Sequence, residues 1–158
     1  MLLTAESGGP NFQNWDIGMI SMGKSRQYTF ILKEKYDELQ PQLSPDGRWL
    51  AYVAGELNAG QMNQVYVSPF PDVGAGKWQI SIDRGNSPRW SPNGKELYYL
   101  IGDNIAETVM AVEIETQPAF RTGKPRVLFR GRYIGTAPNN GIPYDVHPDG
   151  KRFLMMKQ

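Results

Sequence analysis

The sequence predicts an all-β protein built from a repeated sheet of four antiparallel strands, and two observations carry this expectation. A turn cassette of Ser or His, Pro, Asp or Asn, and Gly occurs at residues 44–47, 91–94 and 147–150, each time followed by a basic residue and an apolar strand. The cassette prolines are 47 and 56 residues apart, and a period of roughly 40–50 residues is typical of repeat and propeller proteins. The 17 glycines and 12 prolines are spread along the chain, which suits many short strands joined by turns.

The first cassette lies in the segment "LSPDGRWLAYVA" and has the chemistry of a tight hairpin turn. Pro45 presets φ for the first central position of a type I turn, and Asp46 suits the second position. Gly47 then takes the left-handed position that closes a three-residue hairpin with a bulge. The strands on either side of each cassette are therefore expected to be antiparallel neighbours.

Alignment on the cassettes divides the chain into an incomplete unit (residues 1–35), two full units (36–83 and 84–132) and a final incomplete unit (133–158). The expected strands are 2–6, 15–21 and 27–32; then 40–44, 49–54, 64–70 and 77–81; then 88–91, 96–101, 108–115 and 126–130; and finally 142–147 and 152–157. The best helix candidate, "FILKEKYDELQPQ", has poor apolar spacing and is stopped by Pro41, so a loop is expected there.

These motifs resemble a known family of repeats. The cassettes, together with "QVYVSPFP", "KWQIS", "MAVEIET" and "YDVHPDGKRFLMMK", resemble the TolB-type, WD-repeat-like propeller repeats of bacteria. They are especially similar to the propellers appended to some bacterial Ser/Thr protein kinases. The resemblance covers most of residues 36–158 and is weaker over residues 1–35. It implies four-stranded propeller blades, and it specifies the fold better than the function.

Counted in this way, the chain supplies about three blades, whereas propellers typically close with four to eight. Three blades alone would leave sheet edges exposed. Two copies would make a six-bladed ring with a two-fold axis along its channel, so we expect a homodimer. In that ring, the final unit of one copy would complete the three-stranded first unit of the other, with one second-strand segment displaced or stacked at the edge. Residues 121–158 carry a net charge of +6 and the first 120 residues −5, which favours such pairing and is screened by salt.

Composition argues against several other partners. The net charge is +1, and the basic residues are scattered through strands without a recognition helix, so neither nucleic acid nor a membrane surface is expected as a partner. No apolar run approaches the roughly 18–20 residues of a membrane span. The first residues, "MLLTAESGGPNF", lack the pattern of a signal peptide. The expected location is the cytoplasm for the chain as given, or the periplasm if it is a fragment of an exported protein.

A search for catalytic and metal-binding patterns yields no cofactor, metal or catalytic residue. His147 is the only histidine, and neither a cysteine nor a G-x-S-x-G motif is present. His147 stands where the other cassettes have Ser44 and Ser91, so we expect it to bond turn backbone as they do. The acidic segment "GDNIAE" lacks EF-hand spacing, and no Gly-rich segment matches a phosphate-binding loop.

These observations favour a non-catalytic binding module that takes a protein, peptide or small ligand at the channel mouth or rim. Two alternatives stay open: a hydrolase or lyase that uses channel carboxylates, and a structural remnant of a larger propeller protein. Of the aromatic residues, Trp90 and Tyr144 are expected nearest the channel, although core packing is the favoured role for both. The residues expected to make polar contacts at the channel mouth lie near the starts of the inner strands: Asp37, Glu38, Gln40, Ser87, Arg89, Tyr144 and Asp145.

Overall fold

The computed structural model describes residues 2–7, 15–55, 63–102, 106–133 and 142–157, and these ranges contain no α-helix. The first sheet joins β1 (Leu2–Ser7), β2 (Trp15–Ile20) and β3 (Tyr28–Leu32) in that order. The second sheet has the order β4 (Asp37–Leu43), β5 (Trp49–Gly55), β6 (Gln64–Pro69) and β7 (Trp78–Gln79). A short 3-10 helix, Val73–Ala75, connects β6 to β7.

The third sheet begins with β8 (Asn86–Trp90), β9 (Glu96–Gly102) and β10 (Glu107–Glu115). Beyond β10 the sheet divides, because β11 (Arg121–Thr122) pairs with the end of β10 and β12 (Arg126–Gly131) with its beginning. The fourth sheet is the hairpin of β13 (Tyr144–Val146) and β14 (Phe153–Met155). Every strand pairing in the described chain is antiparallel, so the predicted all-β class is confirmed.

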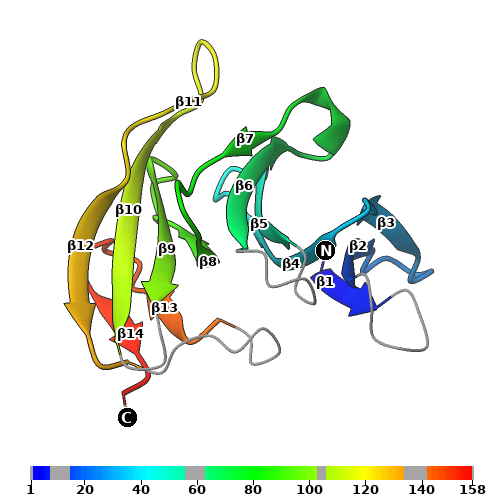
Figure 1. Cartoon of the computed structure of the whole chain (residues 1–158). Coiled ribbons are helices and arrows are strands. Elements are labelled where there is room, and N and C mark those ends of the chain that lie inside the picture. Colours follow the sequence, from blue (N-terminus) through cyan, green and yellow to red (C-terminus); the bar gives the residue numbers. More distant parts are fainter. Residues whose placement is uncertain (1, 8–14, 56–62, 103–105, 134–141, 158) are drawn as a thin grey trace.

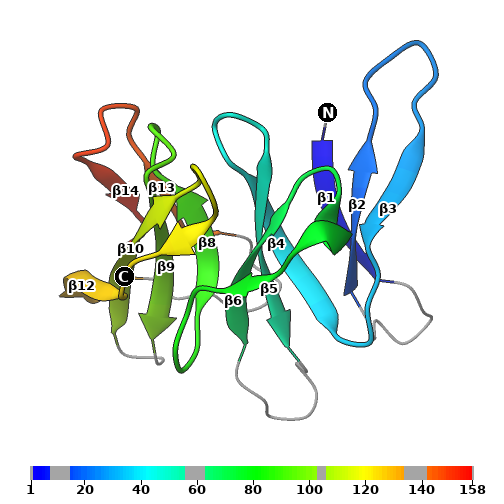
Figure 2. The same ribbon diagram turned by 90° about the horizontal axis from the view of Figure 1, so that it is seen from above.

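The four sheets follow one another across the molecule in chain order, in a propeller-like arrangement (Figures 1 and 2). The first strands of the last three sheets, β4, β8 and β13, are neighbours, since β8 contacts both β4 and β13. We call these three the inner strands. Because they carry equivalent positions of the repeat, they bring residues about 50 positions apart in the sequence into contact.

The cassette turns have the geometry that their sequence predicts. Their glycines all lie in the left-handed region: Gly47 (φ 69), Gly94 (φ 69) and Gly150 (φ 67). The N–H of each glycine donates to the carbonyl of the Ser or His three positions earlier, at 2.8–2.9 Å. The N–H of that Ser or His also donates to the carbonyl of the residue five positions later, at 2.8 Å, which fixes the register of each hairpin.

Successive cassettes also stack on one another. A Cβ placed at Gly94 would lie 3.6 Å from Cδ of Pro45, and one at Gly150 would lie 3.7 Å from Cδ of Pro92. Both distances are ordinary van der Waals contacts. The prolines of the first two cassettes therefore lie beside the glycine of the cassette that follows.

An apolar cluster fills the gap between each pair of successive sheets. Ile17, Leu50 and Tyr52 pack between the first and second sheets, each with no exposed surface. The largest cluster lies between the second and third sheets, around residues such as Leu97, and its edge holds Trp49 against Trp78 and Phe120. A third cluster joins the third and fourth sheets: Tyr98, Leu100, Val109, Ala111 and Tyr144. The core is thus divided by the sheets, as expected where each repeat packs only on its neighbours.

Several strands differ in length from the prediction. The segment predicted at 77–81 pairs only over Trp78–Gln79, and those at 142–147 and 152–157 pair over three residues each. By contrast, β4 begins at Asp37 instead of residue 40, because a bulge between Leu39 and Gln42 lets the strand continue past it. The segment "FILKEKYDELQPQ" is a strand, a turn and a second strand. In the described part of the chain, no helix has the length and apolar character needed to cross a membrane.

Replacement of Gly94 by alanine tests the cassette geometry. A side chain at φ 69 costs about 1 kcal/mol, so we expect Gly94→Ala to lower the free energy of unfolding in urea by about that amount. The control is Gly23→Ala, because a Cβ at Gly23 meets nothing within 4 Å and should change stability by less than about 0.5 kcal/mol. Equal effects of the two substitutions would show that the left-handed turn is not the cause.

Candidate functional site on the inner strands

Three polar residues occupy the same repeat position on the three inner strands. Gln42, Arg89 and Asp145 each lie three residues before a cassette proline, on β4, β8 and β13. Arg89 Nη1 donates to Gln42 Oε1 at 2.7 Å, and Arg89 Nε lies 3.8 Å from Asp145 Oδ1. Arg89 Nε also donates to the Tyr144 carbonyl at 3.4 Å. We call Gln42, Arg89 and Asp145 the polar row; it crosses three sheets in one connected line.

A second line of contacts runs parallel to the polar row through two bulges. Gln40 (φ 53) and Ser87 (φ 55) both lie five residues before a cassette proline, and both have positive φ in a bulge of their strand. Gln40 Oε1 accepts a bond of 2.7 Å from the Ser87 N–H, and the Ser87 carbonyl accepts one of 3.0 Å from the Tyr144 hydroxyl. Non-glycine residues with positive φ store roughly 1–3 kcal/mol of strain, and such residues cluster at functional sites.

The polar row presents its charges to solvent to different degrees. The side chain of Arg89 is 27% exposed and that of Asp145 is 67% exposed. Beside them, Ser87 is fully buried, and its Oγ has no hydrogen-bond partner in the described chain. A buried hydroxyl without a partner is uncommon in native proteins and calls for an explanation such as a bound water or ligand.

The remaining two predicted site residues lie elsewhere. Asp37 is 6% exposed, and its Oδ1 accepts a bond of 2.9 Å from the Trp15 N–H on β2. Glu38 has no exposed surface, and its Oε2 accepts a bond of 3.2 Å from the Glu34 N–H. Both carboxylates thus lie where the first and second sheets meet, apart from the Arg89–Asp145 pair. Of the seven predicted residues, the structure brings five together: Gln40, Ser87, Arg89, Tyr144 and Asp145.

Gln42 is the member of the row that the sequence prediction omitted. Its signal was available, because it lies three residues before its cassette proline, as Arg89 and Asp145 do before theirs. Comparison of equivalent positions across the repeats would have found it without a structure.

The pKa of the buried Glu38 carboxyl is strongly shifted. Burial raises the pKa of Glu38 to about 7, and the charges of Glu34 and Asp16 act in the same direction. The Glu34 N–H and the Lys77 ammonium oppose this rise in pKa. Lys77 is itself held by an ion pair of 2.8 Å with Glu34 and lies 4.8 Å from the ring centre of Tyr66.

Neutralising Glu38 should change how stability depends on pH. The pKa of Glu38 is higher in the folded chain than the ordinary 4.5, so folding favours the protonated carboxyl. Protonation therefore stabilises the folded chain fully below about pH 4.5, and this contribution to the free energy of unfolding is lost as the pH rises toward 7. We expect Glu38→Gln to raise the free energy of unfolding by about 3 kcal/mol at pH 8 and to change it little at pH 5.

The measurement is urea denaturation of both proteins at the two pH values. Glu113→Gln, at an exposed acid on β10, is the matched control and should show no such difference between the two values. If the stability of Glu38→Gln had the same pH dependence as that of the parent, the raised pKa of Glu38 would be contradicted.

Tyr144 acts from within the core. It is 3% exposed, burial raises the pKa of its hydroxyl, and that hydroxyl donates to the Ser87 carbonyl. Tyr144 therefore supports the bulge of β8 from the core side. A ligand on the polar row would meet the backbone carbonyl of Tyr144 and not its ring.

Removal of the Tyr144 hydroxyl tests this positioning role. Tyr144→Phe leaves the Ser87 carbonyl without its donor, so we expect the free energy of unfolding to fall by about 1 kcal/mol in chemical denaturation. Tyr36→Phe, at a tyrosine that is 39% exposed, serves as the control and should be nearly neutral. A neutral Tyr144→Phe would show that this hydrogen bond does not hold the bulge.

His147 behaves as a turn residue. Its Nδ1 lies 3.2 Å from the Asp149 N–H and 3.1 Å from Asp149 Oδ1. The equivalent Ser91 Oγ accepts a bond of 2.9 Å from the Glu96 N–H and donates to Asn93 Oδ1 at 2.8 Å. All these groups bond within their own turn. Within the described residues, no group of three or more His, Cys, Asp or Glu side chains is placed to hold a metal ion.

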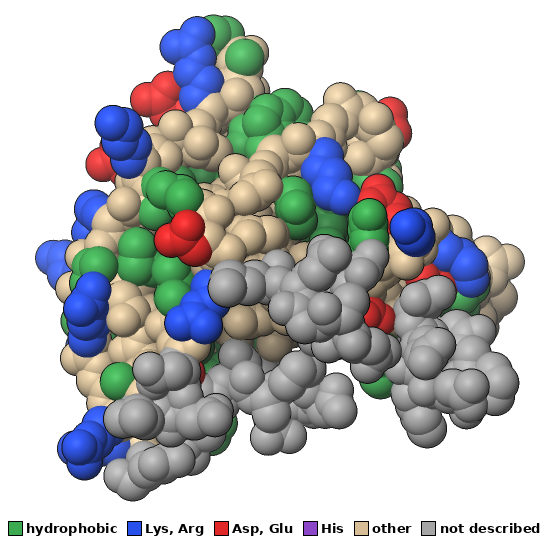
Figure 3. All heavy atoms as spheres, viewed as in Figure 1, with side chains coloured by type: hydrophobic (Ala, Val, Ile, Leu, Met, Phe, Trp, Pro, Cys, Tyr) green, Lys and Arg blue, Asp and Glu red, His purple; other side chains and the backbone are tan. Residues whose placement is uncertain are grey.

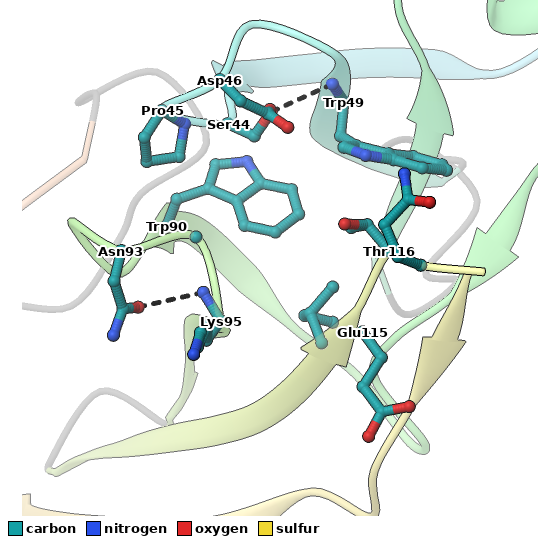
Figure 4. Close-up of a pocket in the computed structure, with 12 residues that line it drawn as sticks. Ser44, Pro45, Asp46, Trp49, Trp90, Asn93, Lys95, Glu115 and Thr116 are labelled. Atoms are coloured by element: carbon teal, nitrogen blue, oxygen red, sulfur yellow. Dashed lines mark hydrogen bonds between the residues drawn. The ribbon is translucent and has the colours of Figure 1, made fainter. Parts of the chain in front are cut away.

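A cavity of about 490 Å³ lies beside the first two cassettes. Figure 4 shows the Trp90 ring between the side chains of the first cassette and those of the second. Trp90 is 8% exposed, packs in the core between the second and third sheets, and donates from Nε1 to the Gln42 carbonyl at 3.3 Å. Trp90 thus forms a wall of this cavity while it supports the strand that carries Gln42.

Comparison with known proteins finds partial similarities. No protein-family model matches the sequence. The chain is 27% identical over 123 residues to a curated protein of Bacillus subtilis (strain 168) named "Uncharacterized peptidase YuxL", a match that covers 73% of this chain and 16% of that protein. It is also similar to the crystal structure of TolB from Acinetobacter baumannii, with 13% identity and a TM-score of 0.49, over 89% of this chain and 42% of that one. The chain therefore spans less than half the length of either protein.

Proposed function

We propose that the chain is a non-catalytic binding module of propeller type that takes a peptide on the polar row of its inner strands. The observation that carries this proposal is the connected line of Gln42, Arg89 and Asp145 across three sheets. The strained bulges at Gln40 and Ser87 support it, because they shape the backbone directly beside the row.

The charges of the row suit the two ends of a peptide. A guanidinium carries five N–H groups, and the Nη2 group of Arg89 makes no hydrogen bond within the described residues. It can therefore receive a ligand carboxylate in a charge-assisted bond. Asp145 is exposed beside it and offers an acceptor for an amine. A cation and an anion side by side match a short peptide with free termini, as well as a loop of a larger protein with charged side chains.

The arrangement of acids argues against the alternative of a hydrolase or lyase. Glu38 has the raised pKa of a candidate general acid or base, but its carboxyl has no exposed surface. Its near neighbours are Glu34 and Lys77, which form an ion pair with each other. Because one relative is named a peptidase, although the match covers 16% of it, peptides are the appropriate first ligands and their hydrolysis has to be measured alongside binding.

The experiment is a nuclear magnetic resonance titration of the ¹⁵N-labelled chain with a pool of tetrapeptides with free termini, and with the same pool acetylated and amidated. We expect the free pool to shift the amide signals of Gln42, Arg89 and Asp145, and the capped pool to shift them less. Arg89→Gln should weaken binding by about tenfold, the order of one charge-assisted bond. Arg130→Gln, at an exposed arginine on β12, is the control.

Three outcomes separate the candidate functions. Shifts at the row with intact peptides by mass spectrometry support a binding module. Cleavage of the pool that Glu38→Gln abolishes would establish the hydrolase. Absence of any shift at the row with either pool would overturn the peptide proposal and favour a purely structural role.

A further inference from the structure

The cavity beside the first two cassettes, about 490 Å³ in volume, has no part in the proposed peptide site. One side of its lining comes from the first cassette and the start of β5. The other side comes from the end of β8, the second cassette and the end of β10. None of the three polar-row side chains is among these lining residues. Because small-molecule sites usually measure roughly 300–1,000 Å³, the cavity is large enough for a ligand of its own.

One part of the lining is aromatic and held in place by packing. Figure 4 shows the Trp90 ring nearly face-on and the Trp49 ring nearly edge-on, across the cavity from it. The ring centre of Trp49 lies 5.7 Å from that of Trp78 and 4.6 Å from that of Phe120. These rings meet between β7 and β11, where Figure 3 shows hydrophobic side chains at the surface. The two tryptophans therefore give the cavity a preformed apolar surface.

The indole N–H of Trp49 lacks an acceptor. Its Nε1 is buried and has no hydrogen-bond partner within the described residues. The indole N–H of Trp90, by contrast, donates to the Gln42 carbonyl at 3.3 Å. A buried donor without a partner is uncommon in native proteins and calls for an explanation such as a bound water or ligand. An oxygen atom at this end of the cavity is what the Trp49 ring requires.

The rest of the lining offers hydrogen-bonding groups of both kinds. The Lys95 ammonium can donate, the Glu115 carboxylate can accept, and the Gln117 amide can do both. In the parts of the chain that the structure describes, these three side chains make no hydrogen bond or ion pair. Their hydrogen-bonding capacity is therefore available to a ligand in the cavity.

The charges of the lining nearly cancel. The Asp46 carboxylate accepts bonds from the Ser44 hydroxyl and the Arg48 N–H, and its Oδ2 lies 3.8 Å from Arg48 Nε. The other ionised groups of the lining are one ammonium and one carboxylate, those of Lys95 and Glu115. Such a pair selects neither an anion nor a cation. The lining therefore favours a neutral ligand that carries many polar groups.

We propose that this cavity binds a short neutral saccharide. A pyranose ring has a face of C–H groups that packs on aromatic rings, and its hydroxyls each donate and accept hydrogen bonds. Trp49 and Trp90 suit the C–H face, and an oxygen of the sugar accepts from the Trp49 N–H. Lys95, Glu115 and Gln117 suit the hydroxyls. The inference does not rest on the proposed peptide function, because no residue of the polar row takes part in it.

The indole N–H signals in nuclear magnetic resonance spectra of the ¹⁵N-labelled chain report on this cavity. Each of the four tryptophans gives one such signal. The probes are cellobiose, maltose and N,N′-diacetylchitobiose, each at millimolar concentration. We expect at least one of them to shift the signals of Trp49 and Trp90 and to leave that of Trp15, on β2, in place. If none of the three shifts the Trp49 and Trp90 signals, the proposal is wrong.

Glu115→Gln tests the polar contact with little risk to the fold, because this side chain is exposed and makes no bond within the described chain. We expect the dissociation constant of the bound disaccharide to rise about tenfold, the order of one charge-assisted hydrogen bond. Glu113→Gln, two residues earlier on β10 and outside the lining, is the matched control and should bind as the parent does. Unchanged affinity of Glu115→Gln would contradict the placement of the saccharide in this cavity.

Two comparisons separate the saccharide from other ligands. Choline chloride supplies a quaternary ammonium, the class of cation that aromatic rings bind. Shifts of Trp49 and Trp90 with choline and none with the saccharides would overturn the proposal in favour of a cation site. Saccharide binding without any response to peptides would refute the peptide proposal alone. Peptide shifts at the polar row without saccharide binding would refute the saccharide proposal alone.

Discussion

The rest of the structure depends on the left-handed glycine that closes each cassette. With φ near 68° and its N–H bonded to a carbonyl three residues earlier, this glycine reverses the chain in a fixed number of residues. A hairpin of fixed length fixes which side chains of the inner strand point to which side. Because the same turn is used three times, residues at the same distance from it meet across neighbouring sheets. The polar row, the two bulges and the proline–glycine stack all follow from this shared register.

The same features show which parts of the molecule a sequence can predict. The three hairpins, the all-β class and the order of strands follow from Pro, Asp or Asn, and Gly at fixed spacing, because these residues act through local backbone geometry. The short pairing of β7 was not predictable: β6 is six residues long, yet β7 pairs with only Tyr66 and Val67, and nothing in the local sequence marks where this pairing stops. Positive φ at Gln40 and Ser87 also leaves no local signal, because neither residue favours it and tertiary contacts impose it.

Asp37 and Glu38 show why the residues of the site are harder to predict from the sequence than the fold. From the sequence they are adjacent acids before a strand, and a channel mouth is a reasonable place for them. In the structure, the Trp15 N–H, 22 residues away, holds Asp37, and packing of the first sheet on the second buries Glu38. Burial of a carboxylate is a property of what covers it, so it cannot be read from its neighbours in sequence. Gln42 is the opposite case, since its repeat position already identifies it.

Pro143 occupies the third copy of the bulge position, five residues before its cassette proline. Its ring restricts φ to about −65°, so this residue, directly before β13, cannot adopt the positive φ of Gln40 on β4 and Ser87 on β8. The wall formed by the inner strands therefore has two kinked strands followed by one that is not kinked. The wall therefore differs from strand to strand in its backbone as well as in the side chains of the polar row, so a ligand on the row would meet a different surface on each strand.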